Sequence, residues 1–315
     1  MKWEDLRRSS NVEDRRGQKS SGFPGGGTRM PGRSGGGMIG NLLLMLLMSK
    51  GKFKWILLAI AAFFLLSGGG SLLTGGNPTV NYGNEGVVFE DTTRKAETAD
   101  QITDKEGAFL STVLASTEDY WTEHFKKYDL TYRQPKLVLY TDGTMTGGCG
   151  FGQAAAGPFY CPGDQSVYID VRFYRDLANK YGAPGDFAMA YVLAHEVGHH
   201  VQQQLGTMDD YQQFIRQQPG RKNEMTVRLE LQADYYAGSW ARYANDQGVV
   251  EEGDLEEALQ AAFAVGDDTL QKETMGYVIP DSFTHGTSAQ RQEWFARGFK
   301  YNGDFKEADT FNRDV

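Results

Sequence analysis

Three of the five histidines of this 315-residue chain lie in one short stretch, "LAHEVGHHVQQQ", residues 193–204. Apolar residues recur around this stretch at helical spacing, which predicts a partly buried helix over about 187–205. His195 and His199 are four residues apart, so both imidazoles project from one helix face and can share a metal ion. Glu196 lies beside them, where its carboxylate can reach a water molecule without binding the metal. This HExxH arrangement predicts a catalytic zinc site.

A catalytic zinc site needs a third protein ligand and an open fourth position. In the stretch "RLELQADYYAGSWARY", Glu230 and Asp234 are four residues apart on a second predicted helix. Glu230 can therefore bind the metal while Asp234 holds the other ring nitrogen of a ligand histidine. Glu224 and His285 compete for the role of third ligand, but Glu224 lacks this context. Gly198, between the two histidines, is interpreted as leaving room for a metal or substrate to approach closely.

The remaining polar residues near the motif have simpler interpretations. His200 follows a predicted ligand but points about 100° away from it on the helix. His124 has no partner motif in the sequence, so we expect both histidines to be structural. The glutamines at 202–204 are predicted to form a polar helix face.

The combination of "HEVGHH" with "ELQAD" resembles the gluzincin peptidases, whose third ligand is the first glutamate of an E-x-x-A-D segment. More narrowly, five segments together resemble the bacterial neutral zinc metallopeptidase family: "NVEDRR", "GPFYCPGDQSVYID", "HEVGHHVQ", "ELQADYYAGSWA" and "HGTSAQRQEWFARGF". These segments extend over most of the chain, so the resemblance is more specific than HExxH alone. It implies a membrane-anchored zinc metallopeptidase. His285 with Arg291 also resembles a His-and-Arg element downstream of the zinc site in related membrane gluzincins.

The chemistry that these residues predict is hydrolysis of a peptide bond by a water molecule activated by Zn2+. Glu196 is the predicted general base, which later delivers the proton to the leaving amine. His285 either donates a hydrogen bond to the oxyanion of the intermediate or bonds a local backbone carbonyl. An extended peptide substrate can pair with a sheet edge expected near residues 166–170.

Two alternatives from other functional classes stay open at this point. One is a non-proteolytic zinc protein with a structural or partner-binding role, against which Glu196 argues because such a site does not need it. The other is a metal-dependent hydrolase of a cell-wall or lipid amide, which the same water chemistry permits.

The expected fold class is α+β: a helix-rich, zincin-like metallopeptidase domain with a small β-sheet. Thr103 and Glu106 form a capping-box pattern that predicts the start of a long amphipathic helix. Strands are predicted at 135–141 and 166–170, and further helices at about 221–245, 254–265 and 288–299.

Composition divides the chain unevenly. Residues 1–54 hold 11 of the 32 basic side chains and 4 of the 41 acidic ones. The acidic remainder excludes a nucleic-acid-binding surface, which needs a clustered basic face. The predicted organisation is a disordered basic segment at 1–37, a short apolar and basic flank at 38–54, a transmembrane helix at 55–73, a linker at 74–100, the zinc metallopeptidase domain at 101–301 and a C-terminal tail at 302–315.

The predicted membrane span is "WILLAIAAFFLLSGGGSLL", residues 55–73, in which no side chain is charged. Nineteen residues span roughly 28 Å as a helix, close to the hydrocarbon thickness of about 30 Å. A cleaved signal peptide is the alternative, although the hydrophilic leader is long for one. Lysines at 50, 52 and 54 favour a cytoplasmic N-terminus and an extracytoplasmic catalytic domain. The apolar run 38–48 is interpreted as an interfacial helix or half of a hairpin.

The only two cysteines, Cys149 and Cys161, enclose a glycine-rich loop. Their short spacing and the predicted extracytoplasmic side favour a disulfide bond between them. The alternative is a pair of unrelated buried thiols.

Overall fold

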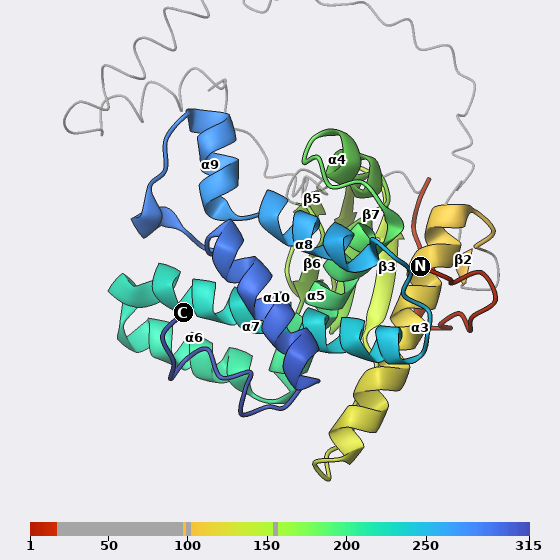
Figure 1. Ribbon diagram of the computed structural model, residues 1–315, viewed down its shortest axis with the longest axis horizontal. Helices are drawn as coiled ribbons and strands as arrows, with labels where there is room; N and C mark the ends of the chain where they lie inside the picture. The colour runs from red at the N-terminus through yellow and green to blue at the C-terminus, as the bar shows by residue number, and fades with distance from the viewer. Residues whose placement is uncertain (18–96, 99–101, 154–156) are drawn as a thin grey trace, which may run out of the picture. The chain divides into compact units, whose positions relative to one another are not determined.

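A computed structural model describes residues 1–17, 97–98, 102–153 and 157–315. It shows a five-stranded sheet with helices packed against it (Figure 1). All of these residues belong to one unit by their contacts. The described residues form many helices and a small sheet, which confirms the α+β class that the sequence predicts.

The sheet has the strand order β2-β1-β3-β7-β6. Strands β1, β3 and β7 are parallel neighbours, whereas β2 and β6 pair antiparallel at the two ends. Both predicted strands are confirmed, as β3 and β7. The bounds are β1 Val12–Asp14, β2 Glu97–Thr98, β3 Lys136–Tyr140, β6 Phe159–Cys161 and β7 Ser166–Asp170, with a separate hairpin of β4 Gly143–Met145 and β5 Phe151–Gln153.

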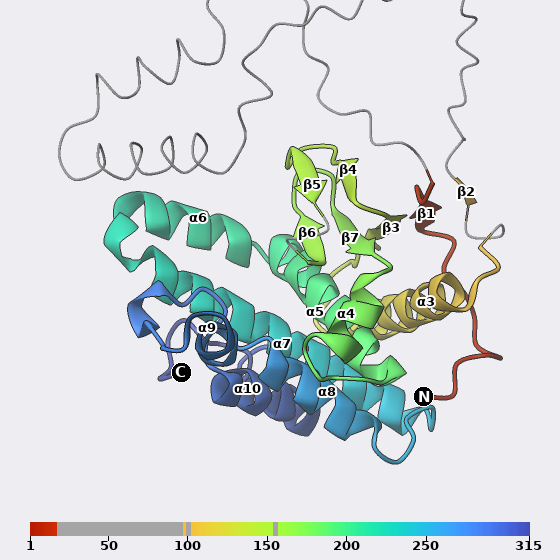
Figure 2. The same ribbon diagram turned by 90° about the horizontal axis from the view of Figure 1, so that it is seen from above.

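Helix α5 (Asp186–Gln204) carries the HExxH motif and lies between the sheet and helices α7 and α8 (Figure 2). All of its residues from Phe187 to Gln202 are buried, as its nearly continuous apolar sequence predicts. The helices predicted at 221–245, 254–265 and 288–299 are confirmed. The helical bounds are α3 Lys105–Lys126, α4 Phe173–Asn179, α6 Thr207–Gln217, α7 Lys222–Asp246, α8 Asp254–Ala264, α9 Asp267–Met275 and α10 Ser288–Tyr301, with 3-10 turns η4 Pro219–Arg221 and η5 Pro280–Ser282.

Glycines set how closely the site helices approach. A Cβ atom on Gly198 would lie 2.9 Å from the carbonyl oxygen of Ala233, so this glycine lets α5 pack against α7. Its interpretation as space for a metal or substrate is therefore wrong. Further along α7, a Cβ atom on Gly238 would collide with the carbonyl oxygen of Phe295 on α10. These contacts fix α7 between α5 and α10.

Helix α3 has its N-cap one residue later than the sequence predicts. Asp104 is the N-cap of α3, and its carboxylate accepts a hydrogen bond from the backbone N–H of Gly107 at 2.9 Å. The predicted capping box at Thr103 is wrong, because the neighbouring Asp104 is the N-cap and its side chain caps the helix.

Residues 1–17, predicted to be disordered, are part of the folded unit. Val12 is 5% exposed in β1, and Met1 and Trp3 lie in the main hydrophobic core. The ring of Trp3 packs edge to face on Phe109 of α3, with centroids 5.5 Å apart. The segment has too few apolar residues for a core of its own, but it completes the core that α3 and β3 supply.

The predicted C-terminal tail, 302–315, also packs on the domain. Ala308 and Thr310 are fully buried, and the hydroxyl of Thr310 donates to the carbonyl of Arg228 on α7 at 2.6 Å.

The predicted flank 38–54 and membrane span 55–73 lie outside the described residues, as does the linker 74–100 apart from 97–98. Of the helices in the part of the chain that the structure describes, none is both long and apolar enough to cross a bilayer.

Candidate metal centre

Helices α5 and α7 bring two imidazoles and one carboxylate together. The rings of His195 and His199 meet edge to face on one side of α5, with centroids 4.9 Å apart. From α7, Oε2 of Glu230 lies 3.1 Å from Nε2 of His195, and Oε1 lies 3.5 Å from Nε2 of His199. The three donor atoms lie within 4.8 Å of one another. Two imidazole nitrogens and a carboxylate in this arrangement fit the protein ligands of a catalytic zinc ion.

The second nitrogen of each imidazole is held by a neighbouring side chain. Nδ1 of His195 donates to Oδ1 of Asp234 at 2.8 Å, and Nδ1 of His199 donates to Oε1 of Gln202 at 2.9 Å. The amide of Gln202 donates in turn to the carbonyl of Leu229 at 2.7 Å. These contacts select the tautomer that leaves both Nε2 atoms for a metal.

Gln202 was missed in the sequence, because the glutamines at 202–204 were interpreted as a polar helix face. Its side chain is fully buried beside the metal centre. The signal for this role is its position three residues after His199, which places both side chains on one face of the helix.

Asp234 is the centre of a buried network. Its carboxylate accepts hydrogen bonds from the hydroxyl of Tyr191 at 2.6 Å and from Nε of Arg291 at 2.8 Å. Burial raises the pKa of Asp234, but Arg291 and His195 outweigh it and lower the pKa to about 2. The carboxylate is therefore ionised at neutral pH and orients the His195 ring. The sequence indicated Arg291 only through its resemblance to a His-and-Arg element, and did not predict its contact with Asp234.

The donor set has a strong affinity for positive charge. Burial lowers the pKa of His195, but Asp234 and Glu230 outweigh it and raise the pKa to about 10. The pKa of His199 is also raised, against the effect of burial, by Glu230. Burial raises the pKa of Glu230, yet the two histidines hold it well below its usual range. A cation and protons therefore compete for the same nitrogens.

A cleft of about 520 Å³ lies over these residues, and both Glu196 and His285 line it. Glu196 is 7% exposed and is not one of the three clustered donors. The His285 side chain is half-exposed, with Nδ1 lying 3.3 Å from Oδ1 of Asp267. Asp267 also accepts hydrogen bonds from the backbone N–H groups of Thr284 and His285, both at 2.6 Å. His285 is thus held by an anchored carboxylate rather than by a backbone carbonyl. The apolar lining comprises Phe159, Phe173, Val192, Met208, Leu229, Val265 and Leu270.

Strand β6 lies along this cleft at the end of the described sheet, and Phe159 and Tyr160 line the cleft. The sheet edge expected near residues 166–170 is formed by β6, because β7 itself pairs with β3 on one side and β6 on the other. The hydroxyl of Tyr160 lies 2.9 Å from Nδ1 of His200, whose Nε2 donates to the carbonyl of Arg133 at 2.6 Å. His200 therefore ties α5 to β6 and has no place among the clustered donors.

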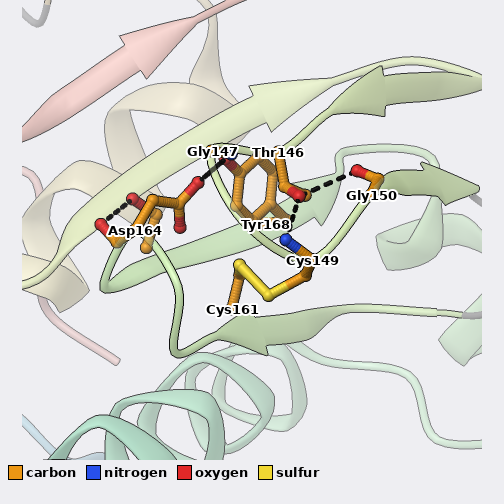
Figure 3. The surroundings of a disulfide bond; sticks show 8 residues. Thr146, Gly147, Cys149, Gly150, Cys161, Asp164 and Tyr168 are labelled. Atoms are coloured by element: carbon orange, nitrogen blue, oxygen red, sulfur yellow. Dashed lines mark hydrogen bonds between the residues drawn. A yellow bond between two sulfur atoms is a disulfide. The ribbon is translucent and has the colours of Figure 1, made fainter.

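The predicted disulfide between Cys149 and Cys161 is confirmed (Figure 3). It joins the last residue of β6 to the loop that precedes β5. In that loop the hydroxyl of Thr146 donates to the carbonyl of Gly150 and accepts from the N–H of Cys149, both at 2.8 Å (Figure 3). The bridge and these bonds hold the loop against the strand that lines the cleft.

Glu224, a competing third ligand in the sequence, and His124, expected to be structural, both lie apart from the donor cluster. Glu224 is at the exposed start of α7, where it pairs with Arg221 at 2.7 Å. Nε2 of His124 lies 2.9 Å from the carbonyl oxygen of Gly303, as expected for a structural histidine.

Comparisons with known proteins relate the chain to zinc metallopeptidases. The family described as "Putative neutral zinc metallopeptidase" matches residues 1–311. The chain is 46% identical to "Uncharacterized protein YpfJ" of Escherichia coli (strain K12) over 319 residues, which cover 100% of both chains. It is 43% identical to "Uncharacterized protein Rv2575" of Mycobacterium tuberculosis (strain ATCC 25618 / H37Rv) over 192 residues, 58% of this chain and 64% of the relative.

The search of solved structures gave no match. Zinc is the cofactor that the matched family implies. Because the family match runs over almost the whole length, this chain belongs to the neutral zinc metallopeptidase family.

Proposed function

We propose that this protein is a membrane-attached zinc peptidase in which His195, His199 and Glu230 bind the metal. The observation that carries the proposal is the donor geometry: three ligand atoms lie within 4.8 Å of one another. The Nδ1 atoms of both histidines are already engaged, by Asp234 and Gln202. Each Nε2 is thereby left to bind a metal, which is the arrangement that a protein zinc site requires.

When bound, zinc lowers the pKa of a water molecule towards about 7 and polarises the scissile carbonyl. Glu196 lies in the same cleft without belonging to the donor cluster. Its carboxylate can therefore take the proton from the attacking water and deliver it to the leaving amine.

His285 is proposed to stabilise the negative charge that develops on the carbonyl oxygen. Asp267 holds Nδ1 of its ring at 3.3 Å. The opposite nitrogen, Nε2, can then donate a hydrogen bond within the cleft that His285 lines.

The proposed substrate is an extended peptide that lies along β6. This strand is at the end of the described sheet and lines the cleft, so its backbone can pair with a peptide. The apolar lining that includes Phe159, Val192 and Leu229 favours substrates with hydrophobic side chains near the scissile bond.

Membrane attachment is proposed for the segment 55–73, which is mostly apolar and carries no charged side chain. The substrate would then be a protein or peptide that reaches the membrane surface.

Cleavage of a peptide library by the purified full-length protein in detergent tests the function. We expect Glu196→Gln to keep its zinc and to lose about 10² to 10⁴-fold in rate, the usual contribution of a general base. Glu256→Gln, on the exposed face of α8, is the matched control and should cleave like the parent. Equal rates for both variants would contradict the role of Glu196.

A further inference from the structure

The chain between β1 and β2 leaves the domain and returns to it at one place. The two strands are antiparallel neighbours, with Asp14 opposite Glu97 and Glu13 opposite Thr98. Antiparallel strands lie about 4.8 Å apart. Residues 18–96, which include both apolar stretches of the sequence, are therefore an insertion between two adjacent strands.

The strand before this insertion cannot be separated from the catalytic domain. Val12, Glu13 and Asp14 pair in parallel with Leu137, Val138 and Leu139 of β3. The N–H of Leu137 donates to the carbonyl of Asn11 at 2.9 Å, and the N–H of Arg15 donates to the carbonyl of Leu139 at 2.8 Å. The first strand is thus inside the sheet, with β2 on one side and β3 on the other.

Polar and charged side chains of residues 1–17 also have their partners in α3 and at its N-cap. The hydroxyl of Ser9 donates to Oε1 of Glu118 at 2.6 Å, and Nη1 of Arg16 donates to Oδ1 of Asp104 at 2.9 Å. Glu118 is 1% exposed, so loss of its partners would leave a buried carboxylate.

We infer that residues 1–17 and the catalytic domain lie on the same side of the membrane, and that the insertion enters and leaves the bilayer through one face. A hydrogen-bonded sheet cannot form across a hydrocarbon layer about 30 Å thick. A single crossing at 55–73 would separate β1 from β3, so the expected arrangement with the N-terminus inside and the domain outside is incompatible with this sheet.

The sequence of the insertion favours shallow entry over a pair of full crossings. Its first apolar stretch, 38–48, has eleven residues and would extend only about 16 Å as a helix, roughly half of the hydrocarbon thickness. Lysines at 50, 52 and 54 separate it from the second stretch, 55–73. Such lysines are most stable among the lipid headgroups. The apolar stretches on either side of them can then both enter the same leaflet of the bilayer. This inference rests on the proposed membrane attachment and is independent of the peptidase activity.

Paired single-cysteine labelling in spheroplasts tests the shared side. The full-length chain with Cys149→Ser and Cys161→Ser receives either Ser10→Cys, before the insertion, or Gln212→Cys on α6; both positions are exposed. A membrane-permeant maleimide is the control for thiol reactivity, and zinc content is the control for folding. We expect an impermeant maleimide to label both positions in intact spheroplasts, or to label both only after permeabilisation. Labelling of one position in intact spheroplasts and of the other only after permeabilisation would overturn the inference.

A second measurement keeps the native cysteines. Spheroplasts are treated with protease, and peptides from residues 1–17 and from α6 are quantified by mass spectrometry before and after the membrane is opened. The inference requires both sets of peptides to change together. Release of only one set from intact spheroplasts would show that the two regions lie on opposite sides. In the chain that lacks both native cysteines, Lys52→Cys tests entry through one face. Labelling of this position by an impermeant maleimide from the side opposite to the domain would overturn it.

Discussion

At the scale of single residues, the two candidate ligand histidines are positioned by different networks. His195 is held by Asp234, which is charged and shared with Arg291 and Tyr191. His199 is held by Gln202, a neutral side chain on its own helix. Because the networks are separate, each should affect metal affinity when it is removed.

Gln202→Leu should weaken zinc binding by about 10-fold or more, since loss of such a supporting contact typically costs 10 to 100-fold. This substitution removes only the side chain that orients His199, and all three metal ligands stay in place. Gln203→Leu is the matched control, because it makes the same substitution at a partly exposed neighbour. Competition with a chelator measures both affinities. If the two variants release zinc equally readily, Gln202 does not position the ligand.

The structural histidines predict a loss of stability in acid. Burial lowers the pKa of His200 and of His124 from 6.5 to about 4. Both groups take up protons more readily when unfolded, so their contribution to stability is present above about pH 6.5 and is lost as the pH falls towards 4. Each shift corresponds to about 3 kcal/mol.

Urea unfolding between pH 7.5 and 4.5 measures this dependence. We expect His200→Gln to be less stable at pH 7.5, because it loses contacts with Tyr160 and Arg133, but to lose less stability on acidification than the parent. An unchanged pH dependence in that variant would contradict the assignment of His200 as a buried neutral side chain.

At the scale of elements, the sequence predicted the site helices well and the sheet edges poorly. Helices α5 and α7 have long apolar patterns and carry the motif residues, so their periodicity was sufficient. Strand β1 was missed because three residues within "NVEDRR" show no periodicity, and their burial depends on β3, which follows more than a hundred residues later. The edge role of β6 depends on strand order, which no local pattern encodes.

The contact between α7 and α10 predicts which glycines tolerate a methyl group. Gly238→Ala should destabilise the protein by about 1 to 3 kcal/mol or more, because its Cβ atom would collide with the backbone carbonyl of Phe295. Gly220 has open space around it and is the control. Chemical unfolding should show a lower midpoint for Gly238→Ala and a change within about 0.5 kcal/mol for Gly220→Ala. Equal midpoints would mean that the helices can move apart without cost.

At the scale of the whole molecule, the catalytic domain is assembled from segments on both sides of the insertion. The family match, which begins at residue 1, agrees with this assembly. Residues 1–17 supply an inner strand and three buried hydrophobic side chains.

This assembly predicts that the insertion can be removed but the N-terminal segment cannot. Replacing residues 20–92 with a short glycine-serine linker should give a zinc-binding protein that stays in solution without detergent, since Asp14 and Glu97 are already neighbours. The same domain beginning at residue 97 should not fold, because β3 loses a partner and the core loses Trp3 and Val12. Gel filtration and zinc analysis distinguish the two. Equal folding of both proteins would contradict the place of β1 in the sheet.

The central claim is that α5 and α7 together hold one catalytic zinc ion, and zinc content per chain tests it most directly. Glu230→Gln should lose the metal, because its carboxylate completes the donor cluster with His195 and His199. Glu224→Gln makes the same change on the same helix, at a residue that pairs with Arg221 instead. The account predicts one zinc ion per chain in the parent and in Glu224→Gln, and little in Glu230→Gln. Undiminished zinc in Glu230→Gln, or loss of zinc only in Glu224→Gln, would contradict it.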